Sequence, residues 1–210
     1  MSTPIYHITH INNLTSIINS GGLIALSILK QKQVSYTNIA YKNIQDQREK
    51  KIVSCGVRGV LYDYVPFYFA PRSPMLYTIH KGNVPGYQHG QTSIIHFLVE
   101  IEAIAKSDLA FVFTDGHPIM AKSNFYEDIQ QLYYIIDWEL MESKYWHDTD
   151  EDNSRKRRRQ AEFLIHKFCP WTLVKEISVI NNDVKIKVQK ILQHLDNQPV
   201  VKIRYDWYYE

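Results

Sequence analysis

The chain has 210 residues, of which 45% are hydrophobic and 22% are charged, a composition typical of globular proteins that argues against disorder or a coiled coil. Its 24 basic and 22 acidic residues leave a net charge of only +2, so bulk electrostatics do not indicate a nucleic-acid-binding protein. A nucleic-acid partner would therefore have to be met by a local basic patch.

The cysteines and the apolar runs restrict the compartment and the chemistry. Cys55 and Cys169 form no C-x-x-C pair, so neither a zinc knuckle nor a dithiol motif is expected. His7 and His10 have H-x-x-H spacing without a third ligand, so no metal site is predicted. Isolated cysteines, no visible signal peptide and no apolar run of about 18 residues predict a cytoplasmic protein without a membrane span.

The N-terminal half of the chain mixes strand and helix patterns. Apolar and polar residues alternate over 4–9, which predicts a strand, and Thr9 is the expected N-cap of a helix that ends at Gly21-Gly22. Farther along we expect, in order, a helix over 38–50, a strand over 60–70 interrupted at Pro66, a helix with Ser73 as N-cap and Pro74 as first residue, a loop over 82–92, and strands over 93–101 and 109–114.

The C-terminal half contains an abrupt change of charge. Residues 148–152 read DTDED, with four acids in five positions, and residues 155–159 read RKRRR. Around these runs we expect partial helix over 125–143, strands near 162–167 and 172–180, a helix over 183–195 capped by Asn182 or Asp183, and a last strand from Pro199. Strands and helices show no regular βαβ rhythm, which predicts an α+β fold in a single domain over 1–210.

Two features of the sequence could carry chemistry, although several familiar motifs are missing. There is no G-x-G-x-x-G, no P-loop and no G-x-S-x-G elbow. Glu162 stands between RKRRRQA and the apolar FLIH, either at the mouth of a cleft or as an exposed partner of nearby arginines. The RKRRR run is either a phosphate clamp or a solvated loop. The 15 tyrosines suit strand packing or base stacking.

Five segments of the chain together resemble the DarT family of DNA ADP-ribosyltransferase toxins. They are, in order, YHITHINNLTSIINSGGL, IQDQREKKIV, YVPFYFAPRSPMLYTIHKG, FTDGHP and RRRQAEFLIH, and they span residues 6 to about 167. The resemblance implies the ADP-ribosyltransferase fold, a split and mainly antiparallel sheet with an NAD-binding cleft. It also implies transfer of ADP-ribose from NAD, a co-substrate rather than a permanently bound cofactor, to a base in single-stranded DNA with release of nicotinamide.

The resemblance further implies roles for individual residues. Glu162 would be the catalytic glutamate, and Arg48 would contact the NAD phosphates and assist in removing a proton from the base. The residues implied for NAD binding are His7, Thr9, Arg48 and Tyr68. The residues implied for binding the nucleic acid are Met75, His117, Arg157, Arg158 and Arg159. The segment at about 141–161 would be the target-recognition loop.

Partners and alternatives complete the sequence-based hypothesis. The resemblance implies a macrodomain antitoxin as a partner, and it favours thymine over guanine as the target base. The resemblance does not extend to the acidic half of the loop, DTDED, so no preferred DNA sequence is predicted. The alternatives are an ADP-ribosyltransferase that modifies RNA or protein, and a noncatalytic nucleic-acid-binding module that uses the RKRRR run and the tyrosines.

Overall fold

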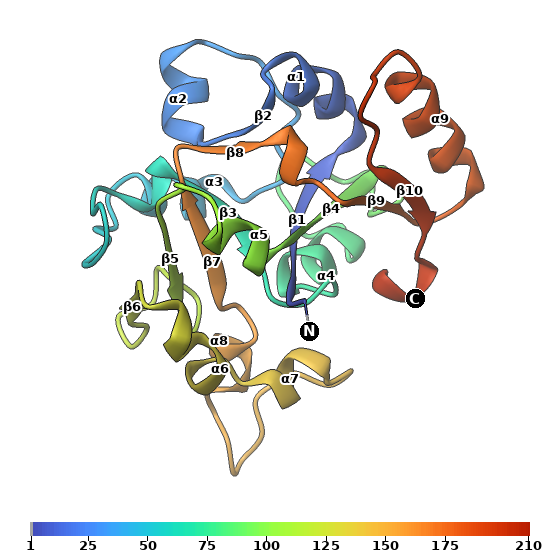
Figure 1. The fold of residues 1–210 in the computed structure, drawn as a ribbon. Helices are drawn as coiled ribbons and strands as arrows, with labels where there is room; N and C mark the ends of the chain where they lie inside the picture. Colours follow the sequence, from blue (N-terminus) through green and yellow to red (C-terminus); the bar gives the residue numbers. More distant parts are fainter. Residues whose placement is uncertain (1) are drawn as a thin grey trace.

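The computed structural model describes residues 2–210 and is built around an eight-stranded sheet (Figure 1). Its strands are β1 (Pro4–His10), β3 (Tyr64–Tyr68), β4 (Ile94–Glu100), β5 (Phe111–Thr114), β6 (Phe125–Tyr126), β7 (Glu162–His166), β9 (Glu176–Val179) and β10 (Val200–Ile203). The strand order is β10-β9-β4-β1-β3-β7-β5-β6, and every neighbouring pair is antiparallel except β9 and β10. A smaller sheet pairs β2 (Gly22–Ile24) with β8 (Phe168–Pro170). The α+β prediction is therefore confirmed.

The large sheet is split between β1 and β3. These strands pair only at Tyr6 and Tyr68, whereas β3 pairs with β7 along its whole length. In the gap, the carbonyl of Pro66 accepts a hydrogen bond from Nδ1 of His7 at 2.8 Å. The nitrogen and carbonyl of a strand residue point the same way, so the missing N–H of Pro66 faces the gap and costs no ladder bond. The predicted interruption of the strand at Pro66 is therefore wrong.

Helices and the smaller sheet cover the two faces of the large sheet. The helices are α1 (Leu14–Asn19), α2 (Leu26–Gln31), α3 (Lys42–Arg48), α4 (Pro74–His80), α5 (Ile101–Ala105), α6 (Leu132–Ile135), α7 (Trp138–Glu142), α8 (Arg155–Arg158) and α9 (Asn182–Leu192). Short 3₁₀ turns lie at Ile11–Asn13, Leu61–Asp63, Ile129–Gln131, Trp171–Leu173 and Tyr205–Trp207. None of the helices in residues 2–210 is long and apolar enough to span a membrane.

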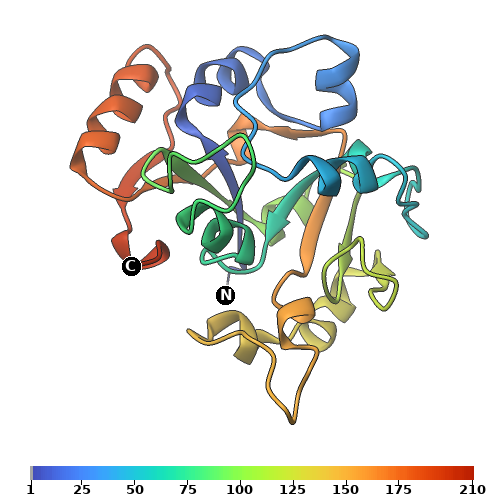
Figure 2. The ribbon, with the colours of Figure 1, turned by 180° about the vertical axis from the view of Figure 1, so that it is seen from behind.

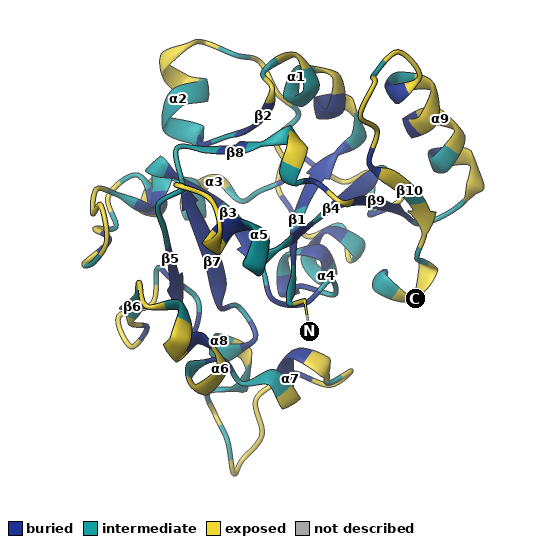
Figure 3. Ribbon diagram, viewed as in Figure 1, coloured by how far each residue is buried: buried dark blue, intermediate teal, exposed yellow. Residues whose placement is uncertain are grey.

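The core lies on both sides of the sheet. The largest cluster joins Phe67, Phe97 and Phe163 of the sheet to residues of α1, α5, α9 and the β2–β8 pair. On the opposite face, seen in Figure 2, α3 and α4 lie in front of the strands. There Leu76 and Ile79 of α4 pack in a second cluster with residues of β1 and β4. Figure 3 shows that the central strands are buried, whereas most of the loop between α7 and α8 is exposed.

Several local predictions are confirmed. Gly21 has φ of +74° and its N–H bonds the carbonyl of Ile18 at 2.9 Å, so glycine ends α1 as expected. Ser73 accepts a hydrogen bond from the N–H of Leu76 at 3.1 Å, with Pro74 as the first residue of α4.

Other element boundaries differ from prediction because tertiary contacts override local patterns. Thr9 lies inside β1 and is not an N-cap, because the His10 side chain accepts the capping bond from the N–H of Asn12. The helix predicted over 38–50 is confined to α3. Asn181, not Asn182 or Asp183, caps α9 through the N–H of Val184. The strand expected over 172–180 begins only at Glu176, after the 3₁₀ turn, and the last strand begins at Val200.

Candidate active site

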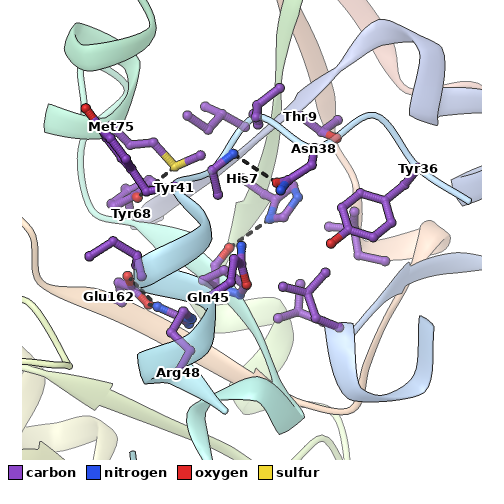
Figure 4. A pocket seen from close by; sticks show the side chains of 18 of the residues that line it. His7, Thr9, Tyr36, Asn38, Tyr41, Gln45, Arg48, Tyr68, Met75 and Glu162 are labelled. Atoms are coloured by element: carbon purple, nitrogen blue, oxygen red, sulfur yellow. Dashed lines mark hydrogen bonds and ion pairs between the residues drawn. The ribbon is translucent and has the colours of Figure 1, made fainter. Parts of the chain in front are cut away.

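A cavity of about 540 Å³ opens at the split between β1 and β3 (Figure 4). The elements that line it include β1, β3, α3, α4, the loop after β5 and the first position of β7. Seven of the residues predicted from the sequence line it: His7, Thr9, Arg48, Tyr68, Met75, His117 and Glu162. The fold thus brings together side chains that are far apart in the sequence, such as His7 and Glu162, which are 155 positions apart.

Glu162 and Arg48 form a buried ion pair in this cavity. Nη1 of Arg48 donates to both carboxylate oxygens of Glu162, at 3.0 and 2.9 Å. The backbone of Glu162 is fixed because its N–H donates to Oγ1 of Thr114 at 3.0 Å. Burial raises the pKa of Glu162 above its ordinary value, and the positive charge of Arg48 opposes that shift. Glu162 is only 3% exposed, which excludes the alternative of a surface carboxylate.

Two further polar atoms of α3 lack partners among the residues that the structure describes. Nη2 of Arg48 and Oε1 of Gln45 are buried and make no hydrogen bond within residues 2–210. They stand one helical turn apart and both residues line the cavity. An unsatisfied buried polar group costs about 1–3 kcal/mol, so a ligand that supplied partners would bind favourably here. The spare N–H groups of a guanidinium suit a phosphate or another oxyanion.

The role of Gln45 was not predicted from the sequence. Its three-residue spacing from Arg48 on one helix face is the signal that could have found it. In Figure 4 it lies between His7 and the Glu162–Arg48 pair.

Two of the histidines that line the cavity, His7 and His117, are neutral near pH 7. Burial lowers the pKa of His7 to about 4, and burial together with the charge of Arg48 lowers the pKa of His117 to about 4. A carbonyl can only accept, so Nδ1 of His7 carries the proton in its bond to Pro66. Nε2 of His7 is consequently left as a hydrogen-bond acceptor, suited to a hydroxyl group.

Tyr68 and Met75 form one wall of the cavity. Tyr68 lies directly opposite Glu162 in the β3–β7 register, so both side chains are on the same face of the sheet. The hydroxyl of Tyr68 donates to Sδ of Met75 at 3.4 Å. Burial and the nearby negative charge of Glu162 raise the pKa of Tyr68, so the phenol stays protonated. The wall therefore offers an uncharged aromatic ring and a polarisable thioether for packing against a flat ligand.

Thr9 has a structural contact at the cavity. Its Oγ1 accepts a hydrogen bond from Nδ2 of Asn13 at 3.0 Å. Asn13 in turn bonds both backbone groups of Thr37, at 2.7 and 3.0 Å. Thr9 thereby helps to hold the segment that leads into α3 against the cavity.

Arg157, Arg158 and Arg159 do not line the cavity, and their guanidinium groups have partners within the protein. Arg157 pairs with Asp115 at 3.2 Å, and Arg158 pairs with Asp137 and Asp152 at 2.9 and 2.6 Å. Arg159 is buried and donates to the carbonyls of Leu140, Met141, Ser143 and Arg72. The structure thus gives these three arginines internal partners, and their contact with DNA stays a prediction. Local charge alone could not reveal this, because the partners lie elsewhere in the sequence.

The loop at 141–161 contributes other residues to the cavity. Trp146, His147, Lys156 and Gln160 line it, and none of them was predicted individually. Lys156 is exposed, and no ion pair or hydrogen bond of its ammonium occurs within residues 2–210. Its N–H donates to Asp148 at 2.8 Å, which gives the acidic DTDED run a structural role. Within the same residues, no cluster of three or more His, Cys, Asp or Glu could hold a metal ion.

Comparison with known proteins identifies proteins whose sequences are similar to this chain. Residues 6–209 match the sequence model of the family described as DarT, ssDNA thymidine ADP-ribosyltransferase. A DNA ADP-ribosyl transferase of Thermus sp. strain 2.9 is 44% identical over 209 residues, which are 99% of this chain and 96% of that protein. A fusion of a DNA ADP-ribosyl transferase with a DNA ADP-ribosyl glycohydrolase, from Thermosipho africanus, is 26% identical over 94% of this chain and 47% of its own length.

Solved structures of the Thermus protein share the fold. DarT of Thermus sp. 2.9 in complex with ADP-ribosylated ssDNA matches with a TM-score of 0.91 and 43% identity, over 99% of this chain and 96% of that one. Its complex with NAD+ matches with a TM-score of 0.87 and 41% identity, over 99% and 98%.

The split sheet, the cavity and these relatives define an NAD-dependent ADP-ribosyltransferase that acts on DNA. Within this class the chain belongs to the DarT family. The resemblance noted in the sequence is thereby confirmed, as are the fold and the reaction class that it implied.

Proposed function

We propose that this chain transfers ADP-ribose from NAD to thymine in single-stranded DNA, with Glu162 as the catalytic residue. The observation that carries the proposal is the buried Glu162–Arg48 pair in a cavity that the split sheet opens. An ion pair that served only to stabilise the fold would not need to lie in the wall of a cavity. A noncatalytic binding module gives no reason to bury an ion pair in the wall of a cavity, because apolar residues in its place are often as stable or more stable.

The chemistry of glycosidic bond cleavage explains the proposed role of Glu162. As nicotinamide leaves, positive charge develops on the ribose attached to it. Glu162 would accept a hydrogen bond from a ribose hydroxyl and stabilise that charge, which a preorganised anion in a closed site does well. Both carboxylate oxygens already accept from one nitrogen of Arg48, which fixes the carboxylate in place before the substrate binds.

The other residues on the NAD side would bind and orient it. The unpartnered Nη2 of Arg48 would donate to a phosphate, and Nε2 of His7 would accept from a ribose hydroxyl. The ring of Tyr68 would pack against the nicotinamide, and Thr9 would act through Asn13 on the cavity wall. A guanidinium is not a base at neutral pH, so Arg48 would assist proton removal by stabilising the anionic base.

We propose that the loop at about 141–161 recognises the DNA target and that it belongs to a single domain with the rest of the chain. Met75 and His117 would contact the target base, and Lys156 would contact a phosphate. We propose an indirect role for Arg157, Arg158 and Arg159, which hold this loop in shape through their internal partners. An unpaired strand exposes the ring nitrogen of its bases, whereas a duplex would have to flip one out.

The biological setting is also a proposal. The Thermosipho relative carries a DNA ADP-ribosyl glycohydrolase in the same chain, which supports a macrodomain antitoxin as the partner that reverses the modification. Cytoplasmic placement is supported by the need for both NAD and DNA and by two free cysteines.

Mass spectrometry of treated oligonucleotides tests the proposed function. The protein is incubated with NAD and single-stranded oligonucleotides that contain or lack thymine, and with a matched RNA and a protein acceptor. We expect the mass of ADP-ribose to be added to thymine of the DNA only. Modification of guanine would change the target base, and transfer only to RNA or protein would replace the proposed substrate class. Absence of any NAD turnover would contradict the enzyme function itself.

Replacement of Lys156 by Ala tests the proposed phosphate contact. We expect the KM for the oligonucleotide to rise, and the plot of log KM against log salt concentration to become shallower by about 0.7 because one phosphate contact is lost. Lys144→Ala is the matched control, since Lys144 is exposed in the same loop but does not line the cavity. An unchanged salt dependence of the Lys156 variant would show that this ammonium does not meet the DNA.

A further inference from the structure

The last residues of the chain are tied firmly to the body of the protein. Tyr208 is 2% exposed, and its hydroxyl hydrogen-bonds the carbonyl of Ile94 at 2.8 Å. The backbone of Tyr209 is held by one side chain, because its N–H donates to Oε1 of Gln91 at 3.1 Å and its carbonyl accepts from Nε2 of Gln91. Terminal residues usually fray unless they are fixed in this way. These two bonds therefore fix the backbone from which the Tyr209 side chain extends.

The side chain of Tyr209 connects three elements. Its hydroxyl accepts a hydrogen bond from Nε1 of Trp146 at 3.2 Å and donates to the carbonyl of Arg72 at 3.0 Å. Its ring packs edge-on against Tyr77 of α4, with centroids 5.1 Å apart, and under the guanidinium of Arg72 at 4.6 Å. The C-terminal segment, α4 and the loop at 141–161 thus meet at the side chain of Tyr209.

Trp146 is the residue through which this contact acts on the loop. It is 4% exposed, whereas the preceding Tyr145 is 74% exposed. Trp146 lines the cavity together with His147, whose ring stacks on it at 4.4 Å. The base of the loop is fixed separately by Arg159, whose Nη2 donates to the same carbonyl of Arg72 at 3.1 Å. The loop is consequently fixed at its base by Arg159 and farther along by Trp146.

We infer that Tyr209 is a positioning residue for the DNA substrate: it holds Trp146, and with it the cavity wall of Trp146 and His147, in the place where DNA binds. The inference rests on the proposed function. Tyr209 does not line the cavity and makes no hydrogen bond to Glu162 or Arg48 within residues 2–210, so it acts on the substrate indirectly. Its hydroxyl acts through Trp146 of the loop, and its ring acts through Tyr77, which also lines the cavity. It should therefore affect the binding of DNA and leave the binding of NAD unchanged.

Tyr209→Phe tests this inference, since it removes the hydroxyl and keeps the ring. We expect the KM for the oligonucleotide to rise about three- to tenfold, the size expected from the loss of one or two hydrogen bonds. The Kd for NAD, measured by calorimetry, should stay within twofold of the unmodified protein. Tyr205→Phe is the matched control, because Tyr205 is 74% exposed in the same segment and its hydroxyl makes no hydrogen bond within residues 2–210.

A double-mutant cycle with Trp146→Phe separates positioning from a general structural effect. If the Trp146–Tyr209 bond transmits the effect, the two substitutions together should raise the KM for DNA no more than the larger single one. Additive effects, an unchanged KM for DNA, or an equal loss of NAD and DNA binding would each overturn the inference. Failure of the unmodified protein to modify DNA would instead contradict the proposed function.

Discussion

Glu162→Gln is expected to slow ADP-ribose transfer to DNA by about a hundred- to a thousandfold, the usual effect of removing one preorganised charge-stabilising group. Gln keeps the shape of Glu and one oxygen that can accept from Nη1 of Arg48, but it carries no negative charge to oppose the charge on the ribose. The loss should fall on kcat, because the missing interaction strengthens only as the glycosidic bond breaks. Single-turnover transfer to a labelled oligonucleotide measures it.

A structural cause of that loss must be excluded, because the substitution also leaves the charge of Arg48 buried without its counter-ion. Breaking a buried pair in this way lowers the free energy of unfolding by about 3–5 kcal/mol. Glu176→Gln is the matched control: Glu176 is also buried and pairs with Arg204 at 3.0 Å, but it does not line the cavity. This control should lose stability and keep its kcat. Full activity of the Glu162 variant would show that its carboxylate is not the catalytic group.

The sequence predicted those parts of the fold that local contacts determine. Gly21 at the end of α1 and Ser73 at the start of α4 act through hydrogen bonds to residues three positions away, so their types and positions suffice. Glu162 was predicted at the start of a strand because the apolar FLIH follows it. Its partner Arg48 lies 114 positions away and could be connected to it only through the resemblance to a family.

The errors arose where a residue's partners are distant in the sequence. Pro66 was predicted to interrupt a strand because proline lacks an N–H for strand pairing. The prediction failed because local residues do not reveal the gap between β3 and β1, where no N–H of Pro66 is needed. The internal partners of the arginine run were missed, because Asp115, Asp137 and the carbonyl of Arg72 lie elsewhere in the sequence. In the same way, the contribution of the C-terminal segment to the loop depends on a bond between Trp146 and Tyr209. Local patterns thus placed strands and caps, whereas side-chain roles needed the tertiary structure.

The ionisation of Glu162 depends on its partner, and Arg48→Gln should reveal that dependence. Burial already raises the pKa of Glu162, and removal of the positive charge that opposes this shift should raise it further. In the proposed mechanism transfer requires the ionised carboxylate, so the acid limb of the kcat profile should move to higher pH. Activity near pH 7 should fall by at least about a hundredfold, because the donor to the phosphate is lost as well.

Stability should respond to pH in the same variant. A carboxyl group whose pKa is higher in the folded than in the unfolded state stabilises the fold at low pH. That stabilisation is lost as pH rises from the ordinary Glu value towards the raised one. The stability deficit of Arg48→Gln relative to the unmodified protein should therefore be larger at pH 8 than at pH 5 in urea unfolding. The double variant Arg48→Gln/Glu162→Gln should lose this dependence, because no ionisable group remains in the pair.

Arg48→Lys separates the charge of Arg48 from its shape. Lysine keeps a positive charge near Glu162, so the acid limb of the kcat profile should stay close to that of the unmodified protein. It lacks the second nitrogen of the guanidinium fork, the atom without a partner in the structure, so the KM for NAD should rise. If Arg48→Gln and Arg48→Lys showed the same pH profile, charge would not be what keeps Glu162 ionised. The pair would then act through geometry alone, with both carboxylate oxygens held by a single nitrogen.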